Sequence, residues 1–176
     1  MITNSEIKAK SHQNDKIREI LLSKDARYIG KDHQIDTYFN FNYGKLKLRR
    51  GNIENALIHY QRENIAEAKK SEVNLVKFDP DSRLWVLEER LKEAFGVLVV
   101  VNKKREIYFI KNVKFHLDVV KDLGSFVEIE AIDSEGKFSL EDLAKQCNFY
   151  KNLFGIKDED LIKGSYSDML LELKDE

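Results

Sequence analysis

Charged and apolar residues alternate along four short stretches of the chain, which is the pattern of β-strands whose two faces differ in chemistry. The stretches span residues 6–10, 45–49, 116–119 and 128–131. Side chains two positions apart share a strand face, so each stretch gathers its charged residues on one side. A single stretch of this kind is typical of a solvated face. Four of them, some basic and some acidic, predict a charged interior or cleft that can hold a polyanion with its metal ions.

The rest of the pattern predicts eight strands and four helices. Strands are expected at 4–12, 28–41, 45–50, 54–63, 69–78, 97–110, 113–121 and 125–132. Helices are expected from Asn14 or Asp15, as the cap, to about 24, then from about 84 to 96 after the only proline, and finally over 166–173. Ser139 and Asp142 fit a looser form of the capping box, which opens a further helix to about 154.

Short turn sequences join many of these strands, which favours antiparallel pairing. The charged strand faces need water or a ligand, whereas the apolar faces need helices against them. We therefore expect an α+β fold built on an antiparallel eight-stranded β-barrel, closed or nearly closed, with a polar interior and helices packed outside. With no long linker or internal repeat, residues 1–176 are expected to form a single domain.

Charge and cysteine content narrow the possible partners. Thirty basic and thirty-one acidic residues give a net charge of -1, which argues against a nucleic-acid coat but permits a local basic channel. Cys147 is the only cysteine, so no intrachain disulfide is possible. We see no signal-peptide run, and the apolar stretch 97–101 is too short to span a bilayer. We expect a cytoplasmic protein without a membrane or nucleic-acid partner.

Two carboxylates, Glu128 and Glu130, share one strand face, and Glu6 is a third candidate on another strand. Oxygen ligands of this kind suit Mg²⁺ or Mn²⁺, which bind a few carboxylates and complete their shells with substrate phosphates. The alternative is a set of ordinary surface glutamates. His116 and Asp118 also share a face, where Asp118 could act as a metal ligand or general base. His116 could orient a ligand, although a lone histidine in a strand is more often structural.

A set of cations on several strands could clamp a phosphate chain, with arginine offering bidentate contacts. The alternative is a group of solvated strand edges that lysine protects against aggregation. The set comprises Lys8, Lys10, Lys45, Lys47, Arg49, Arg62, Lys103 and Arg105.

Seven segments, in order, resemble the CYTH superfamily, also called triphosphate tunnel metalloenzymes. Residues 4–10, NSEIKAK, resemble its N-terminal ExExK signature, with Asn4 in place of the first glutamate. The others are DTYF at 36–39, GKLKLR at 44–49, LIHYQR at 57–62, KKR at 103–105, HLD at 116–118 and GSFVEIE at 124–130. The closing SYSDMLL at 165–171 resembles the branch related to class IV adenylate cyclases.

The resemblance implies a barrel around a charged tunnel and assigns roles to residues. It implies that Glu6, Glu128 and Glu130 hold divalent metal, Mg²⁺ or Mn²⁺. It implies that Asp118 lies near the metals or the reacting group, so that Lys8, Arg105 and Asp118 form the expected catalytic set. The triphosphate would be held by Lys8, Lys10, Lys47, Arg49, Arg62, Lys103 and Arg105. Asparagine binds a divalent ion more weakly than a carboxylate, so Asn4 brings a second metal into question.

Three functions remain open. The first is a class IV-type adenylate cyclase that converts ATP to cyclic AMP and pyrophosphate, which the cyclase-like segments favour. The second is a phosphohydrolase acting on inorganic tripolyphosphate or thiamine triphosphate. The third is a binding module for a nucleotide or polyphosphate with weak or no turnover, which Asn4 suggests. The sequence is compatible with a monomer or a homodimer.

Overall fold

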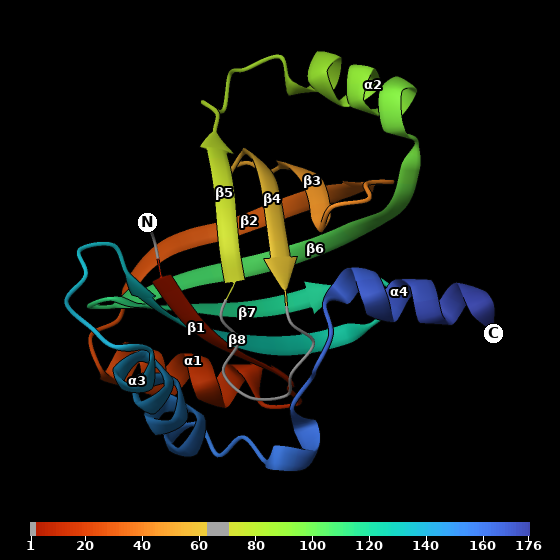
Figure 1. The fold of residues 1–176 in the computed structure, drawn as a ribbon. Coiled ribbons are helices and arrows are strands. Elements are labelled where there is room, and N and C mark those ends of the chain that lie inside the picture. Colours follow the sequence, from red (N-terminus) through yellow and green to blue (C-terminus); the bar gives the residue numbers. More distant parts are fainter. Residues whose placement is uncertain (1–2, 63–70) are drawn as a thin grey trace.

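The structure, a computed structural model, describes residues 3–62 and 71–176, with Arg62, Ser71 and Glu72 described by their backbone alone. Eight strands form one antiparallel sheet in the order β1-β8-β7-β6-β2-β3-β4-β5 (Figure 1). The strands are β1 (Thr3–Lys10), β2 (Arg27–Phe39), β3 (Lys45–Arg50), β4 (Ala56–Arg62), β5 (Ser71–Lys77), β6 (Val97–Ile110), β7 (Val113–Val120) and β8 (Gly124–Asp133). The helices are α1 (Asn14–Ser23), α2 (Leu84–Phe95), α3 (Leu140–Leu153), the short 3₁₀ helix η1 (Asp158–Asp160) and α4 (Tyr166–Asp175).

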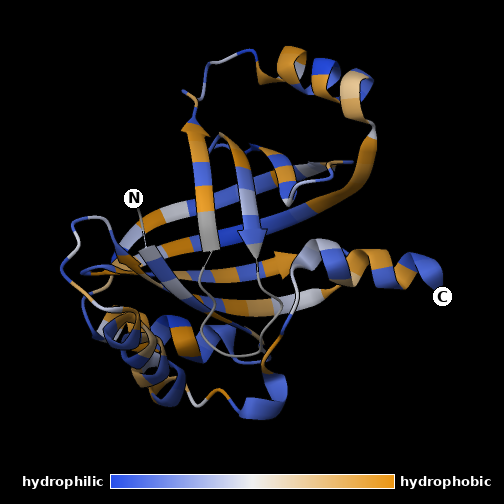
Figure 2. Ribbon diagram, in the orientation of Figure 1, coloured by the Kyte–Doolittle hydropathy of each residue, from blue (hydrophilic) through white to orange (hydrophobic). Residues whose placement is uncertain are grey.

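The sheet curls strongly, so that its two edge strands, β1 and β5, approach one another (Figure 1). The long strands β2 and β6 pair along most of their length and carry the curl from one half of the sheet to the other. Figure 2 shows hydrophilic and hydrophobic residues alternating along the strands. The predicted antiparallel eight-stranded fold with outer helices is confirmed, as a half-barrel in which no ladder joins β1 to β5 among the described residues.

Helices α1 and α3 cover the outer face of the sheet near β1, β7 and β8 (Figure 1). Leu21 of α1 and Leu143 of α3 are fully buried there against Phe115 and Ile129. Burying a large aliphatic side chain contributes about 1.5–3 kcal/mol, so this layer is a main source of stability. The predicted capping box at the start of α3 is present.

Helices α2 and α4 cover the other parts of the sheet. Leu84 of α2 packs against Phe39 and Leu48. Tyr166 and Leu170 of α4 belong to a second core that contains inward-facing residues of several strands, so the start of α4 closes one end of the curled sheet. This helix also begins with a capping box, formed by Ser165 and Asp168.

Some predicted boundaries were wrong. The cap of α1 is Gln13 rather than Asn14 or Asp15, and no side chain caps this helix. Asn14 instead directs its amide towards the carbonyl oxygen of Phe126 at 3.4 Å. The expected strand 54–63 begins only at Ala56. The part of this strand and of the strand 69–78 that falls within 63–70 lies outside the described residues.

The late start of β4 has a local cause in the loop that precedes it. The buried carboxylate of Asp32 accepts hydrogen bonds from the backbone N–H groups of Asn52, Ile53 and Glu54, at 2.8–2.9 Å. These bonds hold the loop in a non-strand conformation. A Cβ at Gly51 would lie 2.6 Å from Asp32 Oδ1, so the loop requires glycine at this position.

Candidate active site

The inner side of the curl encloses a cavity of about 160 Å³ that is lined from all eight strands and from the start of α4. Most of its lining side chains are charged or polar. Their inward position follows from the period of two along each strand, because Glu6 and Lys8, Lys47 and Arg49, and Glu128 and Glu130 lie two residues apart. The predicted charged interior is therefore present, and residues from all four predicted charged faces line it, although Lys10, Lys45 and Asp118 of those faces do not.

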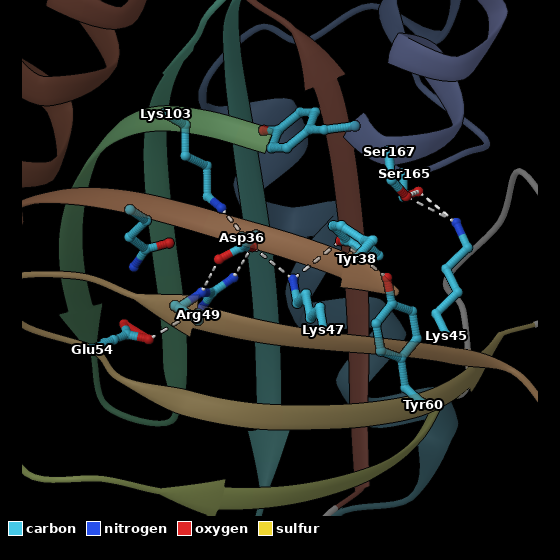
Figure 3. A network of polar contacts seen from close by, with 12 residues as sticks. Asp36, Tyr38, Lys45, Lys47, Arg49, Glu54, Tyr60, Lys103, Ser165 and Ser167 are labelled. Atoms are coloured by element: carbon cyan, nitrogen blue, oxygen red, sulfur yellow. Dashed lines mark hydrogen bonds and ion pairs between the residues drawn. The ribbon is translucent and has the colours of Figure 1, made fainter. Parts of the chain in front are cut away.

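Asp36 of β2 forms one centre of this cavity. Its carboxylate accepts hydrogen bonds from Lys47 Nζ at 2.9 Å and Lys103 Nζ at 2.8 Å (Figure 3). Arg49 donates from both Nε and Nη2 at 2.9 Å, which makes a bidentate pair. Burial raises the pKa of Asp36, but the three cations outweigh burial and hold this pKa well below its usual value. Three cationic side chains thus share this carboxylate, and Arg49 Nη1 also lies 3.5 Å from Glu54 Oε2 (Figure 3).

Arg105 forms the second centre. It donates to Asp118 from Nε and Nη2, both at 2.7 Å, and its Nη2 lies 3.4 Å from Glu128 Oε2. Lys8 Nζ lies 3.6 Å from the same Glu128 oxygen. The Tyr166 hydroxyl donates to Asp118 Oδ2 at 2.7 Å, while Lys8 Nζ sits 4.1 Å from the centre of the Tyr166 ring. Both oxygens of Asp118 are therefore engaged by protein donors.

Burial also affects the protonation of the cations. It lowers the pKa of Lys8, and Glu128 opposes this only in part. It lowers the pKa of Lys103 well below its usual value, against the attraction of Asp36. An added anion would favour the protonated form of both lysines. A bound polyanion would therefore increase the fraction of these two lysine side chains that carry a proton.

His116 lines the same cavity and is buried. Burial lowers its pKa, and the cation Arg105 acts in the same direction, so the neutral ring is favoured. Its Nδ1 lies 3.5 Å from Glu128 Oε1 without a hydrogen bond. Neither ring nitrogen has a hydrogen-bond partner among the described residues. The ring can therefore orient a ligand, in line with one of its two predicted readings.

Glu6 and Glu130 lie directly opposite one another on β1 and β8, and both line the cavity. Like charges in this register repel unless a cation lies between them. Asn4 Nδ2 donates a hydrogen bond to Glu130 Oε1 at 2.7 Å. Asn4, which stands where the ExExK signature has its first glutamate, therefore acts as a donor to a carboxylate of β8. These carboxylates fit Mg²⁺ or Mn²⁺, which take one or two carboxylates and fill their remaining positions with phosphate and water. Among the described residues, no three acidic, histidine or cysteine side chains already form a metal shell.

Not every predicted cation reaches the cavity. Lys10 is exposed at the end of β1 and lines a separate depression. Lys45 turns instead to the start of α4, where its Nζ donates to Ser165 Oγ at 2.7 Å (Figure 3). It also donates to Asp168 Oδ1 at 2.6 Å. The side chain of Arg62 lies outside the described residues. The predicted residues that line the cavity are Glu6, Lys8, Lys47, Arg49, Lys103, Arg105, His116, Glu128 and Glu130.

Asp36 and the start of α4 were given no role by the sequence analysis. Asp36 and Tyr38 lie two residues apart and so share a strand face, and this spacing was the available sequence signal that Asp36 faces the cavity. Tyr166 gave no periodic signal as a cavity residue, because it lies at a helix start rather than on a strand. Lys114 of β7 also lines the cavity and donates to Glu54 at 2.8 Å.

A curled antiparallel sheet with clustered cations and carboxylates on its inner face defines a protein suited to binding a polyanion. The CYTH domain family model matches residues 3–166, and the chain belongs to this family. The chain is 27% identical over 171 residues to "Putative adenylate cyclase MJ0240" of Methanocaldococcus jannaschii, covering 93% of this chain and 96% of that protein.

Solved structures share the fold. PH1012 from Pyrococcus horikoshii matches with a TM-score of 0.78 and 24% identity, over 94% of this chain and 98% of that one. A "putative adenylate cyclase" from Vibrio parahaemolyticus matches with a TM-score of 0.70 and 19% identity, over 95% and 97%. HpAC1 from Hippeastrum, described as having a dominant triphosphatase activity, matches with a TM-score of 0.63 and 15% identity, over 99% and 96%. No helix in the described part of the chain is long and apolar enough to cross a membrane.

Proposed function

We propose that the cavity binds the triphosphate group of ATP and that the protein acts as a class IV-type adenylate cyclase, forming cyclic AMP and pyrophosphate. The observation that carries this proposal is the inward cluster of buried cations around Asp36 and Glu128, with the opposed carboxylates of Glu6 and Glu130 beside it. The name of the Methanocaldococcus relative supports the cyclase reaction over others of the family.

The cations would hold the phosphates by direct charge-assisted hydrogen bonds. Arg105 is held by Asp118 in a bidentate pair, so its remaining donors have a defined direction. Asp118 is fully buried and its oxygens accept from Arg105 and Tyr166, which favours a positioning role over that of a general base. Lys8 and Lys103 would become fully protonated next to phosphate oxygens.

The carboxylates would hold the divalent metal. Glu6 and Glu130 are the best placed, because they lie directly opposite one another on β1 and β8 and both line the cavity. When bound, Mg²⁺ or Mn²⁺ supplies Lewis-acid polarisation of the phosphate and lowers the pKa of the attacking hydroxyl. Asn4 donates a hydrogen bond to Glu130 and so orients one of these carboxylates.

In the proposed reaction the ribose 3′-oxygen forms a bond to the α-phosphorus, and the bond from that phosphorus to the oxygen bridging to the β-phosphate breaks. The hydroxyl proton leaves to solvent. The pyrophosphate leaving group gains negative charge, which Lys8, Lys103 and Arg105 would stabilise because they are preorganised in a buried site. Positioning and electrostatics thus account for catalysis without a covalent intermediate on the protein.

A phosphohydrolase is the second candidate, favoured by the activity described for HpAC1. Water would attack the terminal phosphorus, and the same cations would hold the diphosphate that remains. A binding module with weak turnover is the third, and Asn4 motivates it. Replacing Asn4→Glu tests it: a large gain in turnover indicates a weakened metal site, whereas strong wild-type turnover without a gain excludes the binding module.

Product identification tests the proposal. The protein would be incubated with ATP and Mg²⁺ or Mn²⁺, and products identified by mass spectrometry, with Glu128→Ala as the control. Cyclic AMP and pyrophosphate, absent from the control, are expected. ADP and phosphate would identify a phosphohydrolase and direct the assay to tripolyphosphate and thiamine triphosphate. Failure on all three substrates would leave the binding module as the better description.

A further inference from the structure

Tyr166, the first residue of α4, contacts the second centre of the cavity from a helix rather than from a strand. Its hydroxyl donates to Asp118 Oδ2 at 2.7 Å, and the same carboxylate accepts both hydrogen bonds from Arg105. Lys8 Nζ lies over the Tyr166 ring, 4.1 Å from its centre. Tyr166 is 5% exposed and lines the charged cavity. One side chain therefore touches Lys8 directly and Arg105 through Asp118.

Each of these contacts restrains the direction of a cation. Asp118 is fully buried, and among the described residues its carboxylate accepts hydrogen bonds from Arg105 and Tyr166 alone. The hydroxyl thus supplies the hydrogen bond that ties the pair of Asp118 and Arg105 to the rest of the fold. The face of an aromatic ring attracts an ammonium group, and it does so more strongly in a buried site than in water. The ring therefore holds Lys8 Nζ close to the start of α4.

The Tyr166 side chain is itself held in place, and the start of α4 does not depend on it. Its ring packs against Phe126, with the two ring centres 4.9 Å apart. The capping box of Ser165 and Asp168 fixes the first turn of the helix. Lys45 joins the same two residues to β3. Replacing Tyr166 should therefore remove its contacts with the cavity while the helix start stays docked.

The first centre of the cavity is independent of Tyr166. The hydrogen bonds that Asp36 accepts from cations come from Lys47, Arg49 and Lys103, and none of them involves Tyr166. A phosphate chain would therefore keep these cations in a protein that lacks the Tyr166 contacts. Such a protein would lose only the direction of Lys8 and Arg105, at the second centre.

We propose that Tyr166 is a positioning residue, which directs Arg105 through Asp118, and Lys8 through its ring, towards a bound triphosphate. This inference rests on the proposed function and extends it to a residue of α4. The leaving group gains negative charge as its bond to phosphorus breaks, so the direction of these cations matters more in the transition state than in the bound substrate. Loss of the Tyr166 contacts should therefore lower kcat more than it raises KM.

The outer face of β6 supplies a matched control. Tyr108 is buried, and its hydroxyl donates to Glu106 Oε2 at 3.3 Å. Arg18 pairs with the same carboxylate through Nε and Nη2, at 2.9 and 3.0 Å. This group repeats the tyrosine, carboxylate and arginine of the second centre, but none of its members lines the charged cavity. A purely structural role for Tyr166 predicts the same consequences when either tyrosine is replaced.

Steady-state kinetics of the triphosphate reaction test the proposal. Tyr166→Phe removes the hydroxyl alone, and Tyr166→Leu also removes the ring. We expect Tyr166→Phe to lower kcat about tenfold with KM changed less than about threefold, and Tyr166→Leu to lower kcat about a hundredfold. Tyr108→Phe and Tyr108→Leu should keep both constants within about twofold of the unchanged protein. Urea unfolding shows which variants are folded in the assay, and the two phenylalanine variants are the deciding pair if a leucine variant is not.

Two kinetic results would overturn the positioning role and leave the proposed function intact. One is a kcat of Tyr166→Phe within about twofold of the unchanged protein. The other is an equal loss of kcat in Tyr166→Phe and Tyr108→Phe, which would make the effect a general consequence of losing a buried hydroxyl.

Binding separates the inference from the proposed function. If the unchanged protein turns over none of ATP, tripolyphosphate and thiamine triphosphate, the proposed function fails, and calorimetric titration with tripolyphosphate decides the inference. Each Tyr166 variant should then bind tripolyphosphate more weakly than the Tyr108 variant with the same substitution, by about tenfold for leucine. Equal affinities within each pair would overturn the positioning role. An unchanged protein that binds no tripolyphosphate would overturn both this role and the proposed function.

Discussion

Replacing Asp36→Asn should destabilise the protein and at the same time increase its response to a polyanion. Asp36 is 1% exposed and has three cations within 2.9 Å of its carboxylate. The asparagine keeps the size of the side chain but removes the only carboxylate that contacts Lys47 and Lys103 within the described structure. The variant leaves like charges close together in a buried site.

The size of the effect follows from this geometry. Removing one partner of a buried ion pair costs about 3–5 kcal/mol. At about 2–4 °C per kcal/mol for a protein of this length, the melting temperature should fall by roughly 10 °C. Burial already lowers the pKa of Lys103, so this lysine can lose its proton in the variant and limit the cost. Because the unfolded lysine stays protonated to about pH 10.4, the destabilisation should shrink as pH rises towards that value.

Acid should also reduce the difference in melting temperature between Asp36→Asn and the unchanged protein. The folded pKa of Asp36 is depressed, so its stabilising effect is present above the unfolded value and is lost as pH falls through the folded one. The difference in melting temperature should therefore be largest near neutral pH. Scanning calorimetry across pH gives this profile directly. The exposed pair of Glu141 and Lys145 supplies a matched control, since Glu141→Gln makes the same chemical change without burial and should leave the melting temperature unchanged.

Tripolyphosphate supplies the decisive comparison. If Asp36 occupies cations that a phosphate chain would otherwise bind, added tripolyphosphate should raise the melting temperature more in Asp36→Asn than in the unchanged protein. An unaltered melting temperature in Asp36→Asn would refute the prediction that the ion pairs of Asp36 stabilise the folded protein. A loss of stability without a larger response to tripolyphosphate would refute the idea that Asp36 and the phosphates share partners.

Three further results are expected. Lys8→Ala and Glu128→Ala should each abolish turnover, because each removes one side of a buried pair in the cavity. Both variants should keep a native-like circular dichroism spectrum, and unchanged turnover in both would contradict the site. Tyr166→Phe should lower the free energy of unfolding by about 1–3 kcal/mol, measured in urea, since the charged Asp118 loses a donor, and an unchanged value would show that this bond contributes nothing. Binding of tripolyphosphate should take up protons at a pH between the lowered pKa of Lys103 and the usual lysine value, because burial lowers the pKa of Lys103 and phosphate restores it. Titration heats that do not depend on the ionisation enthalpy of the buffer would contradict the assignment.

The alternation of residues along the chain was sufficient to predict the strands and their inner faces. It gave β3 its observed bounds, Lys45–Arg50, and it placed Lys47 and Arg49 on the inward face. Period-two geometry is local, so it can be read without knowing the neighbouring strands. The capping box at Ser139 was equally readable, because both of its hydrogen bonds lie within four consecutive residues.

The same periodicity could not say where a strand leaves the cavity. Lys10 shares a face with Lys8 but lies beyond the end of the charged interior. Lys45 shares a face with Lys47 but lies close enough to α4 to pair with Asp168. The distinction depends on the curl of the sheet and on the position of a helix more than a hundred residues away. The three cations of Asp36 are of this kind too, since they come from strands that meet only in the folded sheet.

The buried cations of the cavity are already paired with carboxylates, which restricts the ligands that can bind them. Buried cations are stable only with partners, so the empty site must already satisfy them, and Asp36 and Glu128 do so. A ligand binds by offering these cations more negative oxygens than the two carboxylates offer. Lys103, beside Asp36, and Lys8, beside Glu128, line one cavity, so we expect a phosphate chain to contact both centres and a monophosphate only one. Under the proposed function, the need to satisfy both centres, rather than charge alone, would favour a triphosphate over shorter anions.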